Sequence, residues 1–116
     1  MHNYKELDIW KKSMKLCEDV YKIINEFPKD ERFGLVSQTK RSALSVPSNI
    51  AEGAGRNTKG EFSQFLGIST GSLFELETQL ILSKKLIRIE SQEIDICLKN
   101  IEELKKMIYG LQKSLK

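Results

Sequence analysis

The sequence is poor in the residues that most catalytic and metal sites require. Its 116 residues contain one histidine, two cysteines and one tryptophan. The single histidine, His2, lies at the start of the chain, so no Ser–His or Cys–His catalytic pair is indicated. Cys17 and Cys97 are far apart and fall on apolar helical positions. They predict buried free thiols, because zinc needs more ligands and nothing suggests a disulfide.

Other motifs that carry chemistry are also missing. The run Gly53-Ala-Gly55 lacks the Lys-Ser/Thr that completes a phosphate-binding loop. The acidic residues of the second half, Glu75, Glu77, Glu102 and Glu103, have no histidine at the spacing of a di-iron bundle. The sequence therefore predicts a protein that is not an enzyme and holds no cofactor and no metal.

Long hydrophobic runs are absent as well. No apolar stretch approaches the roughly 18 residues that a membrane span needs, and no basic start followed by a hydrophobic stretch suggests a signal peptide. Hydrophobic residues make up 40% of the chain and charged residues 30%, which is typical of a globular protein rich in helix formers. We expect a single cytoplasmic domain over residues 1–116.

Prolines are scarce, and the apolar residues recur at helical spacing along most of the chain. The spacing predicts four helices, over about residues 8–27, 30–54, 58–87 and 91–115, with a turn around Glu90. Thr58 with Glu61 forms a capping box for the third helix, and Ser91 can cap the fourth. Four long amphipathic helices with short connections predict an all-α, antiparallel, up-down-up-down four-helix bundle.

The first helix carries more apolar surface than one bundle needs. Two adjacent apolar seams follow it: one holds Trp10, Met14, Cys17, Tyr21 and Ile24, and the other holds Ile9, Leu16, Val20, Ile23 and Phe27. So wide a face must be covered from two sides, either inside a bundle or between a bundle and a second subunit. In the third helix, Gly67 and Gly71 lie one turn apart and could admit a neighbouring helix. Trp10, Gly67 and Gly71 are therefore predicted contacts between copies in a homo-oligomer.

The second helix contains Pro47, which removes a backbone hydrogen bond to Ala43 and predicts a kink. We expect the side chains of Ser45, Ser48 and Asn49 to bind the freed backbone groups. Gly53 and Gly55 predict the end of this helix through left-handed backbone.

A polar stripe follows the same helix and continues onto the third. Its members are Ser45, Asn49 and Glu52, and Glu75 is expected to face them. Glu52 or Glu75 with Arg41 or Arg56 would then form a partly buried ion-pair network. Two interpretations stay open: a structural polar stripe beside a kinked packing helix, or a contact surface.

One stretch is specific enough to indicate a family. The run Ser45-Val-Pro-Ser-Asn-Ile-Ala-Glu-Gly53, with Leu7-Asp-Ile-Trp10, Glu31-Arg-Phe-Gly-Leu35 and Gly71-Ser-Leu-Phe-Glu-Leu-Glu-Thr-Gln-Leu80, resembles small bacterial four-helix bundle proteins. That family was first noticed as reading frames inside intervening sequences of 23S ribosomal RNA genes. The resemblance implies a pentamer of four-helix bundles. A relative of the family, the accessory protein of diversity-generating retroelements, forms a similar barrel that binds nucleic acid and a reverse transcriptase.

The excess positive charge lies in the middle of the chain. The formal net charge is +3, and residues 31–60 hold five basic residues against two acidic ones. The leading hypothesis is a homo-oligomer that contacts RNA or DNA phosphates without base specificity. Its candidate contacts are Lys11, Lys12, Lys15, Lys40, Arg41, Arg56 and Lys59. The alternative is a structural or protein-interaction scaffold without nucleic-acid binding, for example a partner of a reverse transcriptase or a ribosomal component.

Overall fold

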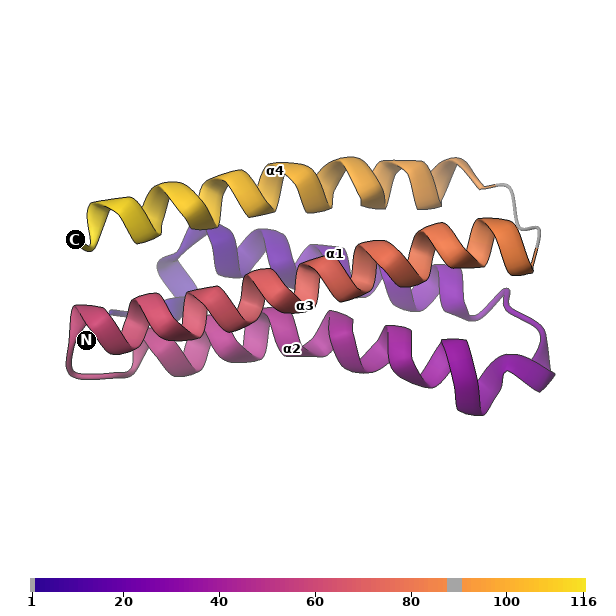
Figure 1. Ribbon diagram of the computed structural model, residues 1–116, viewed down its shortest axis with the longest axis horizontal. Coiled ribbons are helices and arrows are strands. Elements are labelled where there is room, and N and C mark those ends of the chain that lie inside the picture. The colour runs from indigo at the N-terminus through magenta and orange to yellow at the C-terminus, as the bar shows by residue number, and fades with distance from the viewer. Residues whose placement is uncertain (1, 88–90) are drawn as a thin grey trace.

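Four α-helices make up the fold in the computed structural model, which describes residues 2–87 and 91–116, without the side chains of residues 32 and 33. They are α1 (Asp8–Ile24), α2 (Ser37–Ala54), α3 (Lys59–Leu86) and α4 (Gln92–Ser114), and the described residues include no strand. The all-α fold class is thereby confirmed. Figure 1 shows that successive helices run in alternate directions along the bundle. The turn predicted around Glu90 lies outside the described residues.

The helices pack in a closed order around one core. α1 packs against α2 and α4, and α3 also packs against α2 and α4, so α1 and α3 lie on a diagonal. The bundle therefore has four side faces, which we name by their helix pairs: α1–α2, α2–α3, α3–α4 and α4–α1. The α1–α2 face is opposite the α3–α4 face. This placement decides which exposed side chains can meet the same partner.

The core is formed by one apolar stripe from each helix, as the helical spacing predicts. Its fully buried large side chains are Leu16, Val20, Ile50, Phe62, Leu66, Leu73, Leu76, Leu80, Ile94, Ile101, Leu104 and Ile108. Burial of one such side chain stabilises the fold by about 1.5–3 kcal/mol relative to leaving it in water. The two thiols, Cys17 and Cys97, are free and buried, as predicted.

Two helix starts have the predicted caps. The hydroxyl of Thr58 accepts a hydrogen bond from the backbone N–H of Glu61 at 3.1 Å and donates to its carboxylate at 3.0 Å. The hydroxyl of Ser91 accepts from the N–H of Glu93 at 3.1 Å. Residues 29–36, by contrast, form a 3-10 turn (Lys29–Glu31) and a π-helical turn (Arg32–Val36) before α2 begins at Ser37.

The glycines that end α2 act differently from the prediction. Gly55 has φ −83°, in the right-handed region, and no left-handed conformation is recorded at Gly53. Gly53 is buried against α3, where an added Cβ would lie 2.7 Å from the Cβ of Phe65. The prediction that these glycines end the helix through left-handed backbone is therefore wrong. The small size of Gly53 allows α3 to approach α2 closely.

Candidate functional site

Pro47 is buried inside α2, and its freed backbone acceptor is bound from another helix. Cys17 of α1 donates its thiol hydrogen bond to the carbonyl of Ala43, with 2.9 Å between sulfur and oxygen. This is the carbonyl that a proline at position 47 leaves without its helical donor. The expectation that neighbouring serines or Asn49 would bind it is wrong, because Asn49 instead donates to the carbonyl of Ser45 at 2.8 Å. The kink itself stays a prediction.

The chemistry of the two thiols is that of buried, protonated groups. Burial raises the pKa of the Cys17 thiol to about 11, with a smaller contribution from the neighbouring charge of Glu18. Burial also raises the pKa of the Cys97 thiol to about 11, and Asp19 adds to that shift. A protonated thiol can donate a hydrogen bond but is a poor nucleophile. Cys17 is therefore suited to hold Ala43 and poorly suited to covalent catalysis.

The predicted polar stripe lies on the α2–α3 face. Ser72 of α3 donates to the hydroxyl of Ser45 at 2.8 Å, and Asn49 donates to the same hydroxyl at 2.9 Å. Glu52 forms an ion pair with Arg56 at 3.0 Å, but both side chains are about half exposed. The stripe is thus a hydrogen-bonded seam for part of its length and an exposed ion pair at its end.

The partly buried ion-pair network that the sequence suggested is absent from the described part of the chain. Arg41 and Glu75 line one hollow on the α2–α3 face, yet they form no ion pair with each other or with another described residue. Of the predicted pairs, Glu52 with Arg56 is the one that forms among the described residues, and its side chains are about half exposed. The expectation of a partly buried network was therefore wrong.

The seven candidate phosphate contacts do not gather on one face. Ion pairs engage Lys12 with Glu103 at 2.9 Å, Lys15 with Asp19 at 2.7 Å, and Arg56 with Glu52.

The remaining four, Lys11, Lys40, Arg41 and Lys59, form no ion pair with a described residue. Lys40 lies over the ring of Tyr21, with its Nζ 5.4 Å from the ring centroid. Lys59 and Arg56 meet at the α2–α3 turn, where they line a small hollow with His2. The positive charges are therefore spread over several helices.

The α1–α2 face holds an open apolar groove, which the sequence indicated through the wide face of α1. Two adjoining hollows of about 360 and 400 Å³ share Cys17, Glu18 and Leu44. Trp10 and Pro47 line the smaller one, and Met14 and Leu44 are 41% and 49% exposed. One of the two seams of α1 is thus buried in the core, while the other is only partly covered.

The α3–α4 face carries exposed aromatic side chains that the sequence analysis missed. Phe74 is 53% exposed and Tyr109 is 62% exposed. Lys105 of α4 lies 4.3 Å from the centroid of the Phe74 ring, which places that ring on this face. Tyr109 follows Lys105 by one helical turn on the same side of α4. The sequence did contain a signal for this exposure, because Phe74 and Tyr109 both fall outside the apolar spacing that marks the core side of their helices.

Gly67 and Gly71 also lie exposed on α3, close in sequence to Phe74. An added Cβ at Gly67 would meet only the amide nitrogen of Gln112, at 3.8 Å, and one at Gly71 would meet nothing within 4 Å. Nothing described in this chain presses against Gly71. Their predicted role as contacts between copies stays a prediction.

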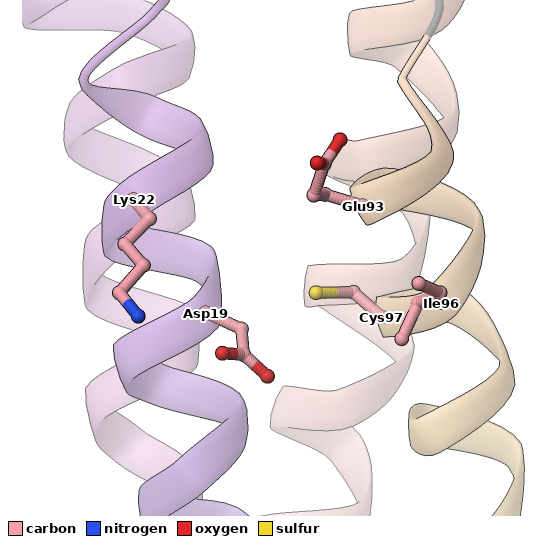
Figure 2. A pocket seen from close by; sticks show the side chains of 5 residues that line it. All are labelled: Asp19, Lys22, Glu93, Ile96 and Cys97. Atoms are coloured by element: carbon pink, nitrogen blue, oxygen red, sulfur yellow. The ribbon is translucent and has the colours of Figure 1, made fainter.

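The α4–α1 face has a small hollow of about 160 Å³. Figure 2 shows Asp19 and Lys22 of α1 across from Glu93, Ile96 and Cys97 of α4, with the sulfur of Cys97 directed toward α1. Although acids and a thiol meet here, no group of three His, Cys, Asp or Glu in the described chain could hold a metal ion. The hollow lies beside the ion pair of Lys15 with Asp19, and we interpret it as a gap between packed helices.

These features define a small all-α bundle with hydrogen-bonded polar seams and with large apolar side chains exposed on its outer faces. A model of the 23S rRNA-intervening sequence protein family matches residues 5–110. The chain belongs to that family, as the resemblance in the sequence predicted. No helix among the described residues has the length and apolar character required to cross a membrane.

A solved structure shares the fold. It is the crystal structure of a protein with unknown function from the S23 ribosomal protein family of Bacteroides thetaiotaomicron, determined at 1.70 Å resolution. The two chains are 21% identical and superpose with a TM-score of 0.80, over 90% of this chain and 98% of the other. The comparison with curated proteins returned no match.

Proposed function

We propose that this chain is a non-enzymatic assembly module whose copies pack head to tail, the α3–α4 face of one copy lying in the α1–α2 groove of the next. The observation that carries the proposal is that large apolar side chains are exposed on two opposite faces, Met14 and Leu44 on one and Phe74 and Tyr109 on the other. Exposed apolar patches of this kind mark interaction surfaces. A cytoplasmic location remains the expectation from the sequence.

The two faces differ in shape. The α1–α2 face is a groove lined by Glu18 and Lys22, whereas the α3–α4 face presents the exposed rings of Phe74 and Tyr109, with Lys113 lying 5.6 Å from the centroid of Tyr109. Exposed rings can enter a groove, and Lys113 can complement Glu18. Because the faces are unlike and lie on opposite sides, a two-fold dimer would cover only one of them. A heterologous contact covers both and closes into a ring when the rotation permits.

The size of the ring follows from the family resemblance, which implies five copies. The glycines of α3 support a close contact, because Gly67 and Gly71 leave the backbone of α3 accessible beside Phe74. Trp10 supports it from the other side, as a partly buried wall of the groove.

Mixing two variants tests the head-to-tail arrangement. Leu44→Glu places a charge in the groove, and Phe74→Glu places one on the aromatic face, so each variant alone should be a 13.3 kDa monomer by light scattering. A mixture should form heterodimers, because the first variant keeps its aromatic face and the second keeps its groove. Ile96→Glu, on the α4–α1 face, is the matched control and should assemble like the unmodified protein.

If the unmodified protein remained a monomer at high concentration, the proposal would be contradicted. Two variants that each assemble normally would contradict it as well. Variants that fail to complement when mixed would point to a symmetric contact instead of a head-to-tail one. Circular dichroism of each variant shows whether its helices are intact, which separates lost assembly from lost folding.

We propose nucleic-acid binding as a second function, supported by the net charge of +3 and by Lys11, Lys40 and Lys59, which have no ion pair with a described acid. A ring would repeat these charges around its surface and raise the avidity for a polyanion. A salt titration with random single-stranded RNA tests this. Affinity already negligible at low ionic strength would remove the function and leave the scaffold alternative.

A charge-reversal variant completes that test. Lys40→Glu combined with Arg41→Glu and Lys59→Glu should abolish RNA binding while the helical signal and the mass of the assembly stay unchanged. Loss of the helical signal in the same variant would instead indicate a structural role for these side chains.

A further inference from the structure

We propose that the hollow on the α2–α3 face binds a small zwitterion of the free α-amino acid class. The hollow has a volume of about 220 Å³ and is lined by Gln38, Arg41, Ser42, Ser45, Ser72 and Glu75. It lies apart from the two apolar faces used for assembly. The inference therefore does not depend on the proposed ring or on nucleic-acid binding.

Short side chains create this hollow. Along the α2–α3 seam, Ser69 donates to the carbonyl of Val46 at 2.9 Å, and the hydroxyls of Ser45 and Ser72 meet at 2.8 Å. Gly53 brings the helices together further along the seam. Serines close the contact between the two backbones but do not fill the space above it. The result is a polar floor between two fixed helices.

The floor offers acceptors to a ligand. Ser72 donates its hydrogen to Ser45, and Ser42 can donate its own to the amide oxygen of Gln79 at 2.5 Å. A hydroxyl has one hydrogen and two lone pairs, so the oxygens of Ser42 and Ser72 keep lone pairs that can face the hollow, whereas Ser45 already accepts from Ser72 and Asn49. A group with several N–H donors, such as an ammonium, is the natural complement.

The walls carry one charge of each sign. Arg41 of α2 and Glu75 of α3 are both exposed, both line the hollow, and neither forms an ion pair with a described residue. A carboxylate can accept two parallel hydrogen bonds from a guanidinium, and an ammonium can donate to Glu75 and to a serine oxygen. A ligand with both groups completes the pair that this chain leaves open.

Size and charge select among the candidate ligands. The volume is smaller than the hollows of about 300–1,000 Å³ that hold drug-sized molecules, which favours a very small ligand. Glu75 repels inorganic phosphate and nucleotides, and Arg41 repels polyamines. A zwitterion complements both walls at once, and the α-amino acids are the common small zwitterions.

Calorimetry with backbone-amide NMR tests the site in the full chain. Each of the standard L-amino acids is titrated singly up to about 10 mM, which reveals even millimolar dissociation constants. We expect saturable binding of at least one, with chemical-shift changes at Ser42, Ser45 and Ser72. Its N-acetylated and carboxamide derivatives, which each lack one charge, should bind at least about tenfold more weakly. Absence of saturable binding, or shift changes confined to another face, overturns the proposal.

Paired variants locate the two charges. Arg41→Gln and Glu75→Gln should each weaken binding at least about tenfold. Arg56→Gln and Glu52→Gln are the matched controls, because they remove the same two residue types from an ion pair outside the hollow, and they should bind as the unmodified chain does. Equal affinity in all four variants overturns the site. The proposal is also overturned if guanosine monophosphate or inorganic phosphate binds in the hollow and no amino acid does. It is overturned likewise if the hollow serves only as a contact between copies of the chain.

Discussion

At the scale of single residues, the contact between Cys17 and Ala43 shows how a proline is accommodated inside a packed helix. Pro47 removes one donor from α2, and a thiol on α1 replaces it at 2.9 Å. The sequence could place Cys17 on a buried seam, because helical spacing shows burial. It could not show which carbonyl the thiol meets, because that depends on how α1 and α2 are aligned. Cys17, which the sequence marks only as a buried apolar position, thus has a specific hydrogen-bond partner.

Replacing this thiol should cost stability. In Cys17→Val the carbonyl of Ala43 stays buried without a donor, so we expect a loss of about 1–3 kcal/mol in the free energy of unfolding. Cys97→Val is the control, because Cys97 is also buried but its thiol donates no hydrogen bond to another described residue. Urea denaturation compares the two variants. A loss in Cys17→Val no greater than in Cys97→Val would contradict the assigned role.

The raised thiol pKa values predict a second effect, at alkaline pH. The pKa of both buried thiols is about 11, against 9.0 for an ordinary thiol. Because the folded pKa is the higher one, their contribution to stability is complete below pH 9 and is lost as the pH rises from about 9 to 11. We expect a decline of about 1–3 kcal/mol per thiol in the free energy of unfolding over that range. In a variant with both cysteines changed to valine, the decline over the same pH range should be smaller by the contribution of the two thiols.

At the scale of helices, the periodic apolar spacing was sufficient to predict four helices and the core side of each. The Thr58 and Ser91 caps were equally readable, because a cap is a local contact between neighbouring residues. The close approach at Gly53 was not, since the residue that requires it, Phe65, lies on another helix. The absent ion pair between Arg41 and Glu75 has the same origin. Spacing along one helix does not fix the separation of side chains across two.

Two glycine variants distinguish a glycine that is packed against another helix from a glycine on an open surface. Gly53→Ala would bring its Cβ within 2.7 Å of the Cβ of Phe65, so α3 must shift and we expect a loss of about 1–3 kcal/mol of stability. Gly71→Ala meets nothing within 4 Å in this chain and should stabilise a single copy by about 1 kcal/mol, because alanine favours helix. Thermal unfolding measures both effects. Destabilisation by Gly71→Ala in the monomeric Phe74→Glu background would contradict the open surface described here.

At the scale of the whole molecule, the bundle divides its surface by helix pair. The α1–α2 face is an apolar groove, and the α3–α4 face combines the exposed rings of Phe74 and Tyr109 with the ion pairs of Lys84 with Asp95 and of Lys105 with Glu77. The α2–α3 face is polar, and the α4–α1 face holds the ion pair of Lys12 with Glu103. Assembly through the first two faces leaves the other two free in every copy. Composition alone could suggest excess apolar surface, but only the order of packing shows that it lies on opposite sides. That order favours a head-to-tail contact over a two-fold dimer.

Assembly also governs how strongly a weakly basic chain can hold a polyanion. One copy has a net charge of +3, and three of its seven candidate contacts are already paired with acids, so a single copy should bind RNA weakly. Phe74→Glu keeps all seven residues but should be monomeric, so we expect its affinity for a long single-stranded RNA to fall by about 10²-fold or more. The dependence of log affinity on log salt should also become shallower, since fewer phosphates are contacted at once. Fluorescence anisotropy across a salt series measures both quantities, with Ile96→Glu as an assembled control that carries the same added charge. If the monomeric variant bound RNA as tightly and with the same salt slope as this control, the binding surface would lie within one copy and the ring would have no part in it.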